Sequence, residues 1–214
     1  MKLTKYEKNP ILSPNPQNSW ENLVRTNPGA WYDAENHEVI MLYRAAGDDK
    51  EHRVNIGLAK SKNGYEFETI GNQPLFQTVE GTWDGGSIED PRIIKMGDYY
   101  FITYAAVTCP PGRYWEMEKR QIPSDVPEEA PFILRENETR TGLAITKDFK
   151  TIYRPGYLTD ATVDDRDVII FPEKVGGKFV TLHRPMQWVG EKYGTDSPAI
   201  WLAFSDDSLE RGCD

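Results

Sequence analysis

The chain repeats one order of segments three times, and this repeat limits the folds that it can adopt. Each copy opens with a polar head residue and continues through three short runs that are bounded by Gly, Asn and Asp turns. The head residues are Asn27, Asp90 and Asp167. The second runs end in Tyr43-Arg44, Tyr104-Ala105 and His183-Arg184, and the closing runs contain Leu58-Ala59, Leu143-Ala144 and Leu202-Ala203. Because no run shows a helical period, we expect β-strands throughout.

A unit of several short strands that recurs after some tens of residues is typical of β-propeller blades. We therefore predict an all-β single domain over residues 1–214, with blade-like repeats near 20–70, 86–155 and 163–210. The Pro- and charge-rich insertion 108–138 interrupts the second repeat, and we expect either a surface loop or a flap over the propeller axis. Closed propellers usually have about 4 to 8 blades. Three repeats therefore leave open a fragment, a ring completed by a partner, or another repeat fold.

The charge and the cysteine content limit the kinds of binding partner that we expect. The formal net charge is -9, which disfavours nucleic acid because its binding needs a basic face. The two cysteines, Cys109 and Cys213, lie far apart and have no metal-ligand spacing, so we predict no metal site. The N-terminal residues lack the apolar core of a signal peptide, and no run approaches the length of a membrane span. We therefore expect a cytoplasmic protein without a membrane partner.

The stretch Glu89-Asp90-Pro91-Arg92 concentrates charge at the head of an apolar run. Adjacent carboxylates repel each other unless a partner or a ligand compensates them. Asp90 is the candidate acid, and the alternative is an Asx-Pro turn cap at the start of a strand. Strand alternation would turn Glu89 away from the axis, where an ion pair with Arg92 would explain it.

The same stretch carries a resemblance to a known family. Gly86-Ser87-Ile88-Glu89-Asp90-Pro91-Arg92-Ile93 resembles a motif of glycoside hydrolase family 130, the β-mannoside phosphorylases. Leu42-Tyr43-Arg44-Ala45, Phe171-Pro172-Glu173-Lys174-Val175-Gly176-Gly177-Lys178 and Leu182-His183-Arg184-Pro185 are similar to further motifs in the same order. The resemblance spans about residues 9 to 207 and implies a five-bladed β-propeller, of which this chain resembles the first three blades.

The resemblance also implies roles for individual residues. Asp90 matches the family's catalytic acid, which acts through a sugar hydroxyl as a relay, and Asn27 and Arg44 match positions that bind the sugar. Glu89 is a further substrate-binding candidate. For Asn27 the alternative is a turn before Pro28.

A phosphorylase also needs cations for its phosphate. The candidates are Arg166, His183 and Arg184, with Lys174 as a weaker member, because arginine binds phosphate in a bidentate manner and histidine can add a hydrogen bond. The alternative is a structural ion pair of Arg166 with Asp165 or Asp167, or of Arg184 with a carboxylate. For Lys174 the alternative is a solvated turn.

We therefore predict an inverting β-mannoside phosphorylase that uses inorganic phosphate as co-substrate and no cofactor. Its partners would be a small oligosaccharide and phosphate, and a homo-oligomer stays open. The first alternative is an inverting β-mannosidase, which would use two carboxylates. The second is a truncated, non-catalytic carbohydrate-binding module. No motif indicates a nucleotide cofactor or a serine triad.

Overall fold

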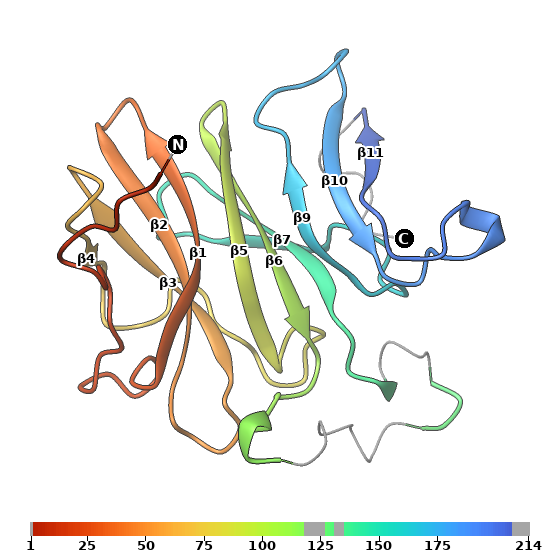
Figure 1. Ribbon diagram of the computed structural model, residues 1–214, viewed down its shortest axis with the longest axis horizontal. Helices are drawn as coiled ribbons and strands as arrows, with labels where there is room; N and C mark the ends of the chain where they lie inside the picture. Colours follow the sequence, from red (N-terminus) through yellow and green to blue (C-terminus); the bar gives the residue numbers. More distant parts are fainter. Residues whose placement is uncertain (1, 118–126, 131–134, 207–214) are drawn as a thin grey trace.

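The computed structural model describes residues 2–117, 127–130 and 135–206, and its strands form antiparallel sheets (Figure 1). Its first sheet has the strand order β1 (Val24–Asp33), β2 (Glu38–Ala46), β3 (Val54–Ser61) and β4 (Glu68–Thr69). The second has the order β5 (Ser87–Met96), β6 (Tyr99–Val107), β7 (Arg140–Thr146) and β8 (Tyr153–Tyr157). The third contains β9 (Asp165–Ile170), β10 (Phe179–Pro185) and β11 (Trp201–Ser205), with β10 in the middle. The described helices are two 3-10 turns, η1 (Tyr114–Glu116) and η2 (Glu191–Tyr193).

These sheets confirm the all-β prediction. Each of them runs antiparallel between strands that are neighbours in the sequence. No helix in the described residues is long and apolar enough to cross a membrane.

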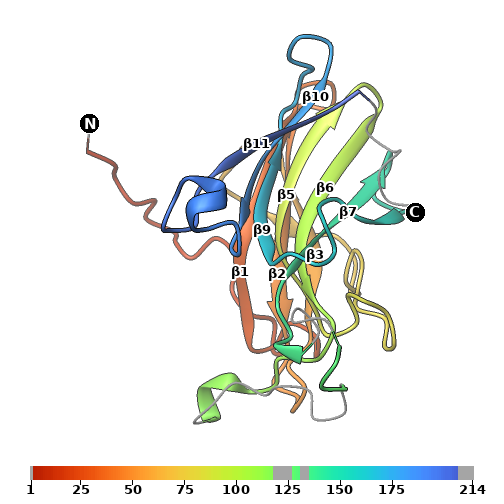
Figure 2. The same cartoon turned by 90° about the vertical axis from the view of Figure 1, so that its right-hand side faces the viewer.

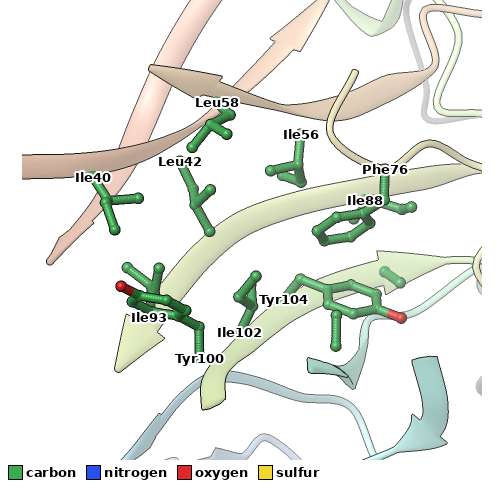
Figure 3. Close-up of a cluster of buried hydrophobic side chains, with 12 residues drawn as sticks. Ile40, Leu42, Ile56, Leu58, Phe76, Ile88, Ile93, Tyr100, Ile102 and Tyr104 are labelled. Carbon is green, nitrogen blue, oxygen red and sulfur yellow. The ribbon is translucent and has the colours of Figure 1, made fainter. Parts of the chain in front are cut away.

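The main core lies between the first and second sheets. Leu42, Ile56 and Ile102 are fully buried there, and Figure 3 shows the side chains of β2 and β3 facing those of β5 and β6. Strands β2 and β6 are almost continuously apolar because they are buried on both faces. A smaller cluster, with Leu143, Ile145 and Ile170 at its centre, joins the second sheet to the third.

The first strand of every sheet contains a bulge at the same point. Between Thr26 and Gly29 the first strand uses one residue more than its partner β2. The same excess occurs in β5 between Glu89 and Arg92, and in β9 opposite the pair Leu182 and Arg184. A β-bulge leaves one residue unpaired and changes the direction in which its side chain points. The head residues of the three repeats therefore share one backbone geometry.

The opening strands also lie side by side. Strand β1 packs against β5, and β5 packs against β9, as Figure 1 shows from left to right. Gly29 allows the closest approach, because a Cβ atom on it would lie 2.3 Å from the carbonyl oxygen of Pro91. The missing side chain therefore brings the bulge of β1 next to the bulge of β5.

The start of the predicted insertion docks on the loop that follows β2. Gly112 N donates to Glu51 O at 2.8 Å, and the Arg113 guanidinium donates to the carbonyl oxygens of Asp48 and Asp49. Figures 1 and 2 both show η1 beyond the end of β6. Residues 118–126 and 131–134 of the predicted insertion 108–138 lie outside the described residues.

Asp33 links the first sheet to the second from the end of β1. Its side chain is 2% exposed and accepts hydrogen bonds from Tyr100 Oη at 2.7 Å and from Asn36 Nδ2 at 2.7 Å. Burial raises the pKa of this carboxyl. Hydrogen bonds from Asn36 and Tyr100, and the charge of Lys95, outweigh burial and lower the pKa from 3.8 to about 2.

This lowered pKa predicts a pH dependence of stability. Because the pKa of Asp33 is lower in the folded state, its contribution is fully present above about pH 4 and is lost as the pH falls towards 2. In Asp33→Asn, urea unfolding should therefore give a free energy of unfolding that falls less between pH 4 and pH 2 than in the wild type. Asp98→Asn, at a side chain that is 83% exposed, is the control and should follow the wild type. Equal slopes in Asp33→Asn and wild type would contradict the assignment.

Candidate active site

Asp90 occupies the bulge of β5 in a left-handed conformation, with φ of 50°. Asn27 and Asp167, at the two equivalent bulges, have φ of 44° and 60°. Asn and Asp tolerate this region better than other residues with a Cβ atom, which explains why the heads are of these types. The Asp90 side chain, 26% exposed, accepts hydrogen bonds at Oδ1 from Asn27 Nδ2 at 2.7 Å and from Arg44 Nη1 at 3.1 Å.

The structure therefore brings three of the predicted residues together. The acid candidate and both sugar-binding candidates meet at the junction of the first and second sheets. Their roles stay predictions.

Glu89 joins the same group, against the expectation from alternation. Its Oε2 lies 2.9 Å from Arg44 Nη1, and its Oε1 accepts a hydrogen bond from Ser87 Oγ at 2.5 Å. The bulge interrupts the alternation of side chains, so that Glu89 and Asp90 both reach Arg44. The expected ion pair of Glu89 with Arg92 is therefore wrong.

Arg92 instead extends from the second sheet towards the third. Its Nη1 donates to the carbonyl oxygens of Asp90 and Pro91, each at 3.1 Å. Its Nη2 lies 3.4 Å from Oδ1 of Asp167. Oδ2 of Asp167 accepts from Arg184 Nη2 at 2.7 Å. Asp167 is thus shared between two guanidinium groups that come from different sheets.

Arg166 and Arg184, two of the predicted phosphate-binding residues, lie opposite each other on β9 and β10, but their side chains have different partners. Arg184 lies beside Asp167, whereas Arg166 pairs with Asp164 at 2.6 Å and with Glu138 at 3.3 Å. Burial lowers the pKa of Arg166. The hydrogen bond and charge of Asp164, followed by the charge of Glu138, raise it overall. Arg166 therefore stays a cation held between acids.

Of the two remaining candidates, His183 directly precedes Arg184 on β10, and Lys174 lies beyond the other end of that strand. His183 is buried, and its Nδ1 lies 2.7 Å from Oδ2 of Asp165. It lines a largely apolar cavity of about 360 Å³ between the second and third sheets, together with Leu143 and Trp188. Lys174 lies in the turn between β9 and β10, at the opposite end of the hairpin, with its Nζ 4.2 Å from the centre of the Phe179 ring. Phosphate binding by these residues stays a prediction.

Acidic and basic groups alternate across the site. Glu89, Asp90 and Asp167 supply carboxylates, and arginines 44, 92 and 184 contact them. Within the described ranges, the structure holds no group of three or more His, Cys, Asp or Glu side chains that could bind a metal ion. The group can hold hydroxyl groups and an anion by hydrogen bonds and charge, and it carries a carboxyl group that can transfer a proton.

The sequence analysis did not identify a Trp-acid dipeptide that lies seven residues before two of the head residues and packs beneath the site. Trp20-Glu21 precedes Asn27, and Trp83-Asp84 precedes Asp90 at the same spacing. Each acid accepts a hydrogen bond from a buried tyrosine of the second strand of its sheet, Tyr43 at 2.9 Å and Tyr104 at 3.1 Å. Each Trp ring stacks on that tyrosine ring. The repeated Trp-acid dipeptide was a readable signal of this support.

Comparison with known proteins extends these observations. The profile of glycoside hydrolase family 130, described as beta-1,4-mannooligosaccharide phosphorylase, matches residues 2–123. The chain belongs to glycoside hydrolase family 130. The match covers more than half of the chain and includes Asn27, Arg44 and Asp90.

Curated relatives in family 130 are longer than this chain. The 1,2-beta-oligomannan phosphorylase of Thermoanaerobacter sp. (strain X514) is 28% identical over 97% of this chain and 58% of its own length. The beta-1,4-mannooligosaccharide phosphorylase of Ruminococcus albus is 24% identical over 85% of this chain and 46% of its own length. This chain therefore spans about half the length of these relatives.

Solved structures show the same fold. The beta-1,2-mannobiose phosphorylase from Listeria innocua, in complex with beta-1,2-mannobiose, superimposes with a TM-score of 0.65 and 22% identity. The match covers 95% of this chain and 63% of the other. A putative glycoside hydrolase from Parabacteroides distasonis gives a TM-score of 0.66 at 18% identity. At these identities the likeness concerns the fold alone.

The left-handed backbone of Asp90 predicts an unusual order of substitutions. Asp90→Gly should be more stable than Asp90→Ala by about 1 kcal/mol, because an L residue with a Cβ atom pays roughly 1–2 kcal/mol in this conformation and Gly does not. Urea unfolding of the two variants measures the difference.

The neighbouring residue supplies the matched control. Glu89 is not among the described residues with positive φ, so Glu89→Gly should be less stable than Glu89→Ala by about 0.5–1 kcal/mol. The same order at both positions would contradict the bulge geometry.

Proposed function

We propose that this chain carries the catalytic acid and the mannose-binding residues of an inverting β-mannoside phosphorylase. The observation that carries the proposal is the carboxyl group of Asp90, which is held between Asn27 and Arg44 on a strained bulge. Membership of family 130 and phosphorylases among the relatives support the reaction class. Strained backbone at such a point is typical of functional sites.

The proposed reaction exchanges one bond at the anomeric carbon for another. An oxygen of inorganic phosphate attacks this carbon from the α face and forms the new C–O bond, while the β-glycosidic C–O bond breaks. Asp90 supplies the proton that the leaving oxygen takes up, through a sugar hydroxyl as the family resemblance implies. The products are α-mannose 1-phosphate and an oligosaccharide shortened by one mannose.

The side chains around Asp90 would bind the sugar. Asn27 and Arg44 contact Asp90 directly, so a mannose hydroxyl at Asp90 would also lie within their reach.

Phosphate would bind on the side of the third sheet. Arg184 supports this assignment because it lies beside Asp167, at the bulge next to that of Asp90. Arg166 stays a member of the proposed phosphate site, although it pairs with two acids in this structure. The role of His183 would be indirect, because it orders Asp165, whose Oδ1 accepts from Arg184 N at 2.9 Å.

The geometry disfavours Glu89 as the second carboxylate of an inverting hydrolase. An inverting hydrolase keeps its two carboxyl groups about 6.5–9.5 Å apart, so that a water molecule fits between them and the sugar. Arg44 Nη1 lies 2.9 Å from Glu89 Oε2 and 3.1 Å from Asp90 Oδ1, so these oxygens are no farther apart than the sum of the two distances. Glu89 is therefore too close to Asp90 to serve as the base for water.

We also propose that the three sheets are consecutive blades of a five-bladed β-propeller. The adjacency of β1, β5 and β9 supports this arrangement, because the opening strands of blades line a common axis. The third sheet leaves Ile169, Leu202 and Phe204 exposed, at 44%, 50% and 61%, which is typical of a surface that a further element covers.

Dependence on phosphate tests the reaction class. The purified chain, incubated with β-1,2- or β-1,4-mannobiose, should release mannose 1-phosphate when inorganic phosphate is present and almost no mannose in its absence. Chromatography of the products measures both. Equal release of free mannose with and without phosphate would indicate the mannosidase. Binding of the sugar by calorimetry without any product would indicate a carbohydrate-binding module.

Replacement of the acid tests its assignment. Asp90→Asn should lower turnover by about 10²- to 10⁴-fold, because the amide N–H is not acidic enough to transfer a proton to the leaving oxygen. The amide can still accept from Asn27 and Arg44, so its circular dichroism and thermal midpoint should stay close to those of the wild type. Asp98→Asn, in the exposed turn between β5 and β6, is the matched control and should keep full activity. Turnover of Asp90→Asn at the wild-type rate would refute the role of Asp90.

A further inference from the structure

We propose that Arg92 is a positioning residue that holds Asp90 in its left-handed conformation. The proposal deepens the proposed function and rests on it, because it concerns the placement of the same acid. Arg92 lies two residues after Asp90 on β5, yet its guanidinium folds back onto the bulge.

The contacts of Arg92 fall on the backbone of the strained residue. Nη1 donates to the carbonyl oxygen of Asp90 and to that of Pro91, each at 3.1 Å. The bulge removes these residues from the regular ladder between Glu89 and Arg92. A residue at φ of 50° costs of order 1–3 kcal/mol and persists only when its surroundings determine it. One guanidinium nitrogen that contacts both carbonyls supplies part of that determination.

The other nitrogen of Arg92 ties the bulge to the third sheet. Nη2 lies 3.4 Å from Asp167 Oδ1, and Asp167 occupies the equivalent bulge at φ of 60°. Arg184 Nη2 approaches the second oxygen of Asp167 at 2.7 Å. Arg92 therefore links the backbone that carries the acid to the side chain that orients a proposed phosphate ligand. The planar guanidinium can do this because it presents several donors in a fixed arrangement.

Distances and exposure favour positioning over a simple ion pair. The carbonyl contacts, at 3.1 Å, are shorter than the ion pair with Asp167, at 3.4 Å. Side chains of Arg92 and Asp167 are 37% and 40% exposed, and ion pairs at such exposure contribute little stability. The effect of Arg92 is therefore expected on the geometry of Asp90 rather than on the stability of the fold.

The first experiment observes that geometry. A crystal structure of Arg92→Met should show Asp90 outside the positive φ region, with its contact to Asn27 lost. Arg53→Met is the matched control, because Arg53 donates to a backbone carbonyl on the approach to β5, that of Gly85, away from the bulge. It should leave Asp90 unchanged. An Asp90 in Arg92→Met that keeps its left-handed φ and its contacts with Asn27 and Arg44 would overturn the proposal, whatever the activity of the chain.

The second experiment separates positioning from phosphate binding. Phosphorolysis by Arg92→Met should show a kcat lowered by about 10- to 100-fold, since a displacement of about 1 Å can lower a rate 10²-fold. KM for mannobiose and KM for phosphate should stay within about twofold of the wild type, as for a group that acts only on placement of the acid. Arg92→Lys, which keeps a donor near the carbonyls, should recover part of kcat.

Two results of the kinetic experiment have distinct meanings. A raised KM for phosphate with unchanged kcat would make Arg92 an anion ligand and would overturn the proposal. Absence of phosphorolysis in the wild type would reject the proposed function instead, and the crystal structures would still decide whether Arg92 positions Asp90.

Discussion

The left-handed backbone at Asn27, Asp90 and Asp167 is the constraint on which the candidate site depends. Each of these residues stands where the first strand of a sheet has one residue more than its partner, and each has a positive φ. Regular pairing would alternate the side chains between the two faces of the sheet. The bulge instead directs Glu89 and Asp90 towards the same arginine. Without it, the acid and its partners would lie on different faces.

Contacts between sheets hold this arrangement together. Asn27 and Arg44 from the first sheet hold the side chain of Asp90 in the second. Arg92 reaches from the second sheet to Asp167 in the third, where Arg184 completes the chain of contacts. The core beneath, between the first two sheets, fixes the distance at which these side chains meet. The site therefore forms only where the sheets pack together, and no single sheet contains it.

The sequence predicted the frame of this arrangement because repeats are a property of the chain order itself. The three heads have equivalent positions in their sheets, and so do the strands that carry Arg44 and Arg184, β2 and β10. The alternation of side chains along a strand predicted the wrong direction for Glu89. A bulge changes the backbone, and the hydrophobic pattern of the sequence does not show it. The partner of Arg92 lies 75 residues away and depends on the packing of two sheets, so local spacing could not identify it. Lys174 lies apart from the other candidates, because a hairpin turn lies at the opposite end from the head of its strand.

The most direct measurement of the central claim is a crystal structure of the chain with β-1,2-mannobiose and inorganic phosphate. We expect a mannosyl residue in contact with Asn27, Arg44 and Asp90, with a proton-donating path from Asp90 to the bridging oxygen. We also expect the phosphate on the side of Arg184. Sugar bound in the cavity between the second and third sheets, or bound without contact to Asp90, would contradict it.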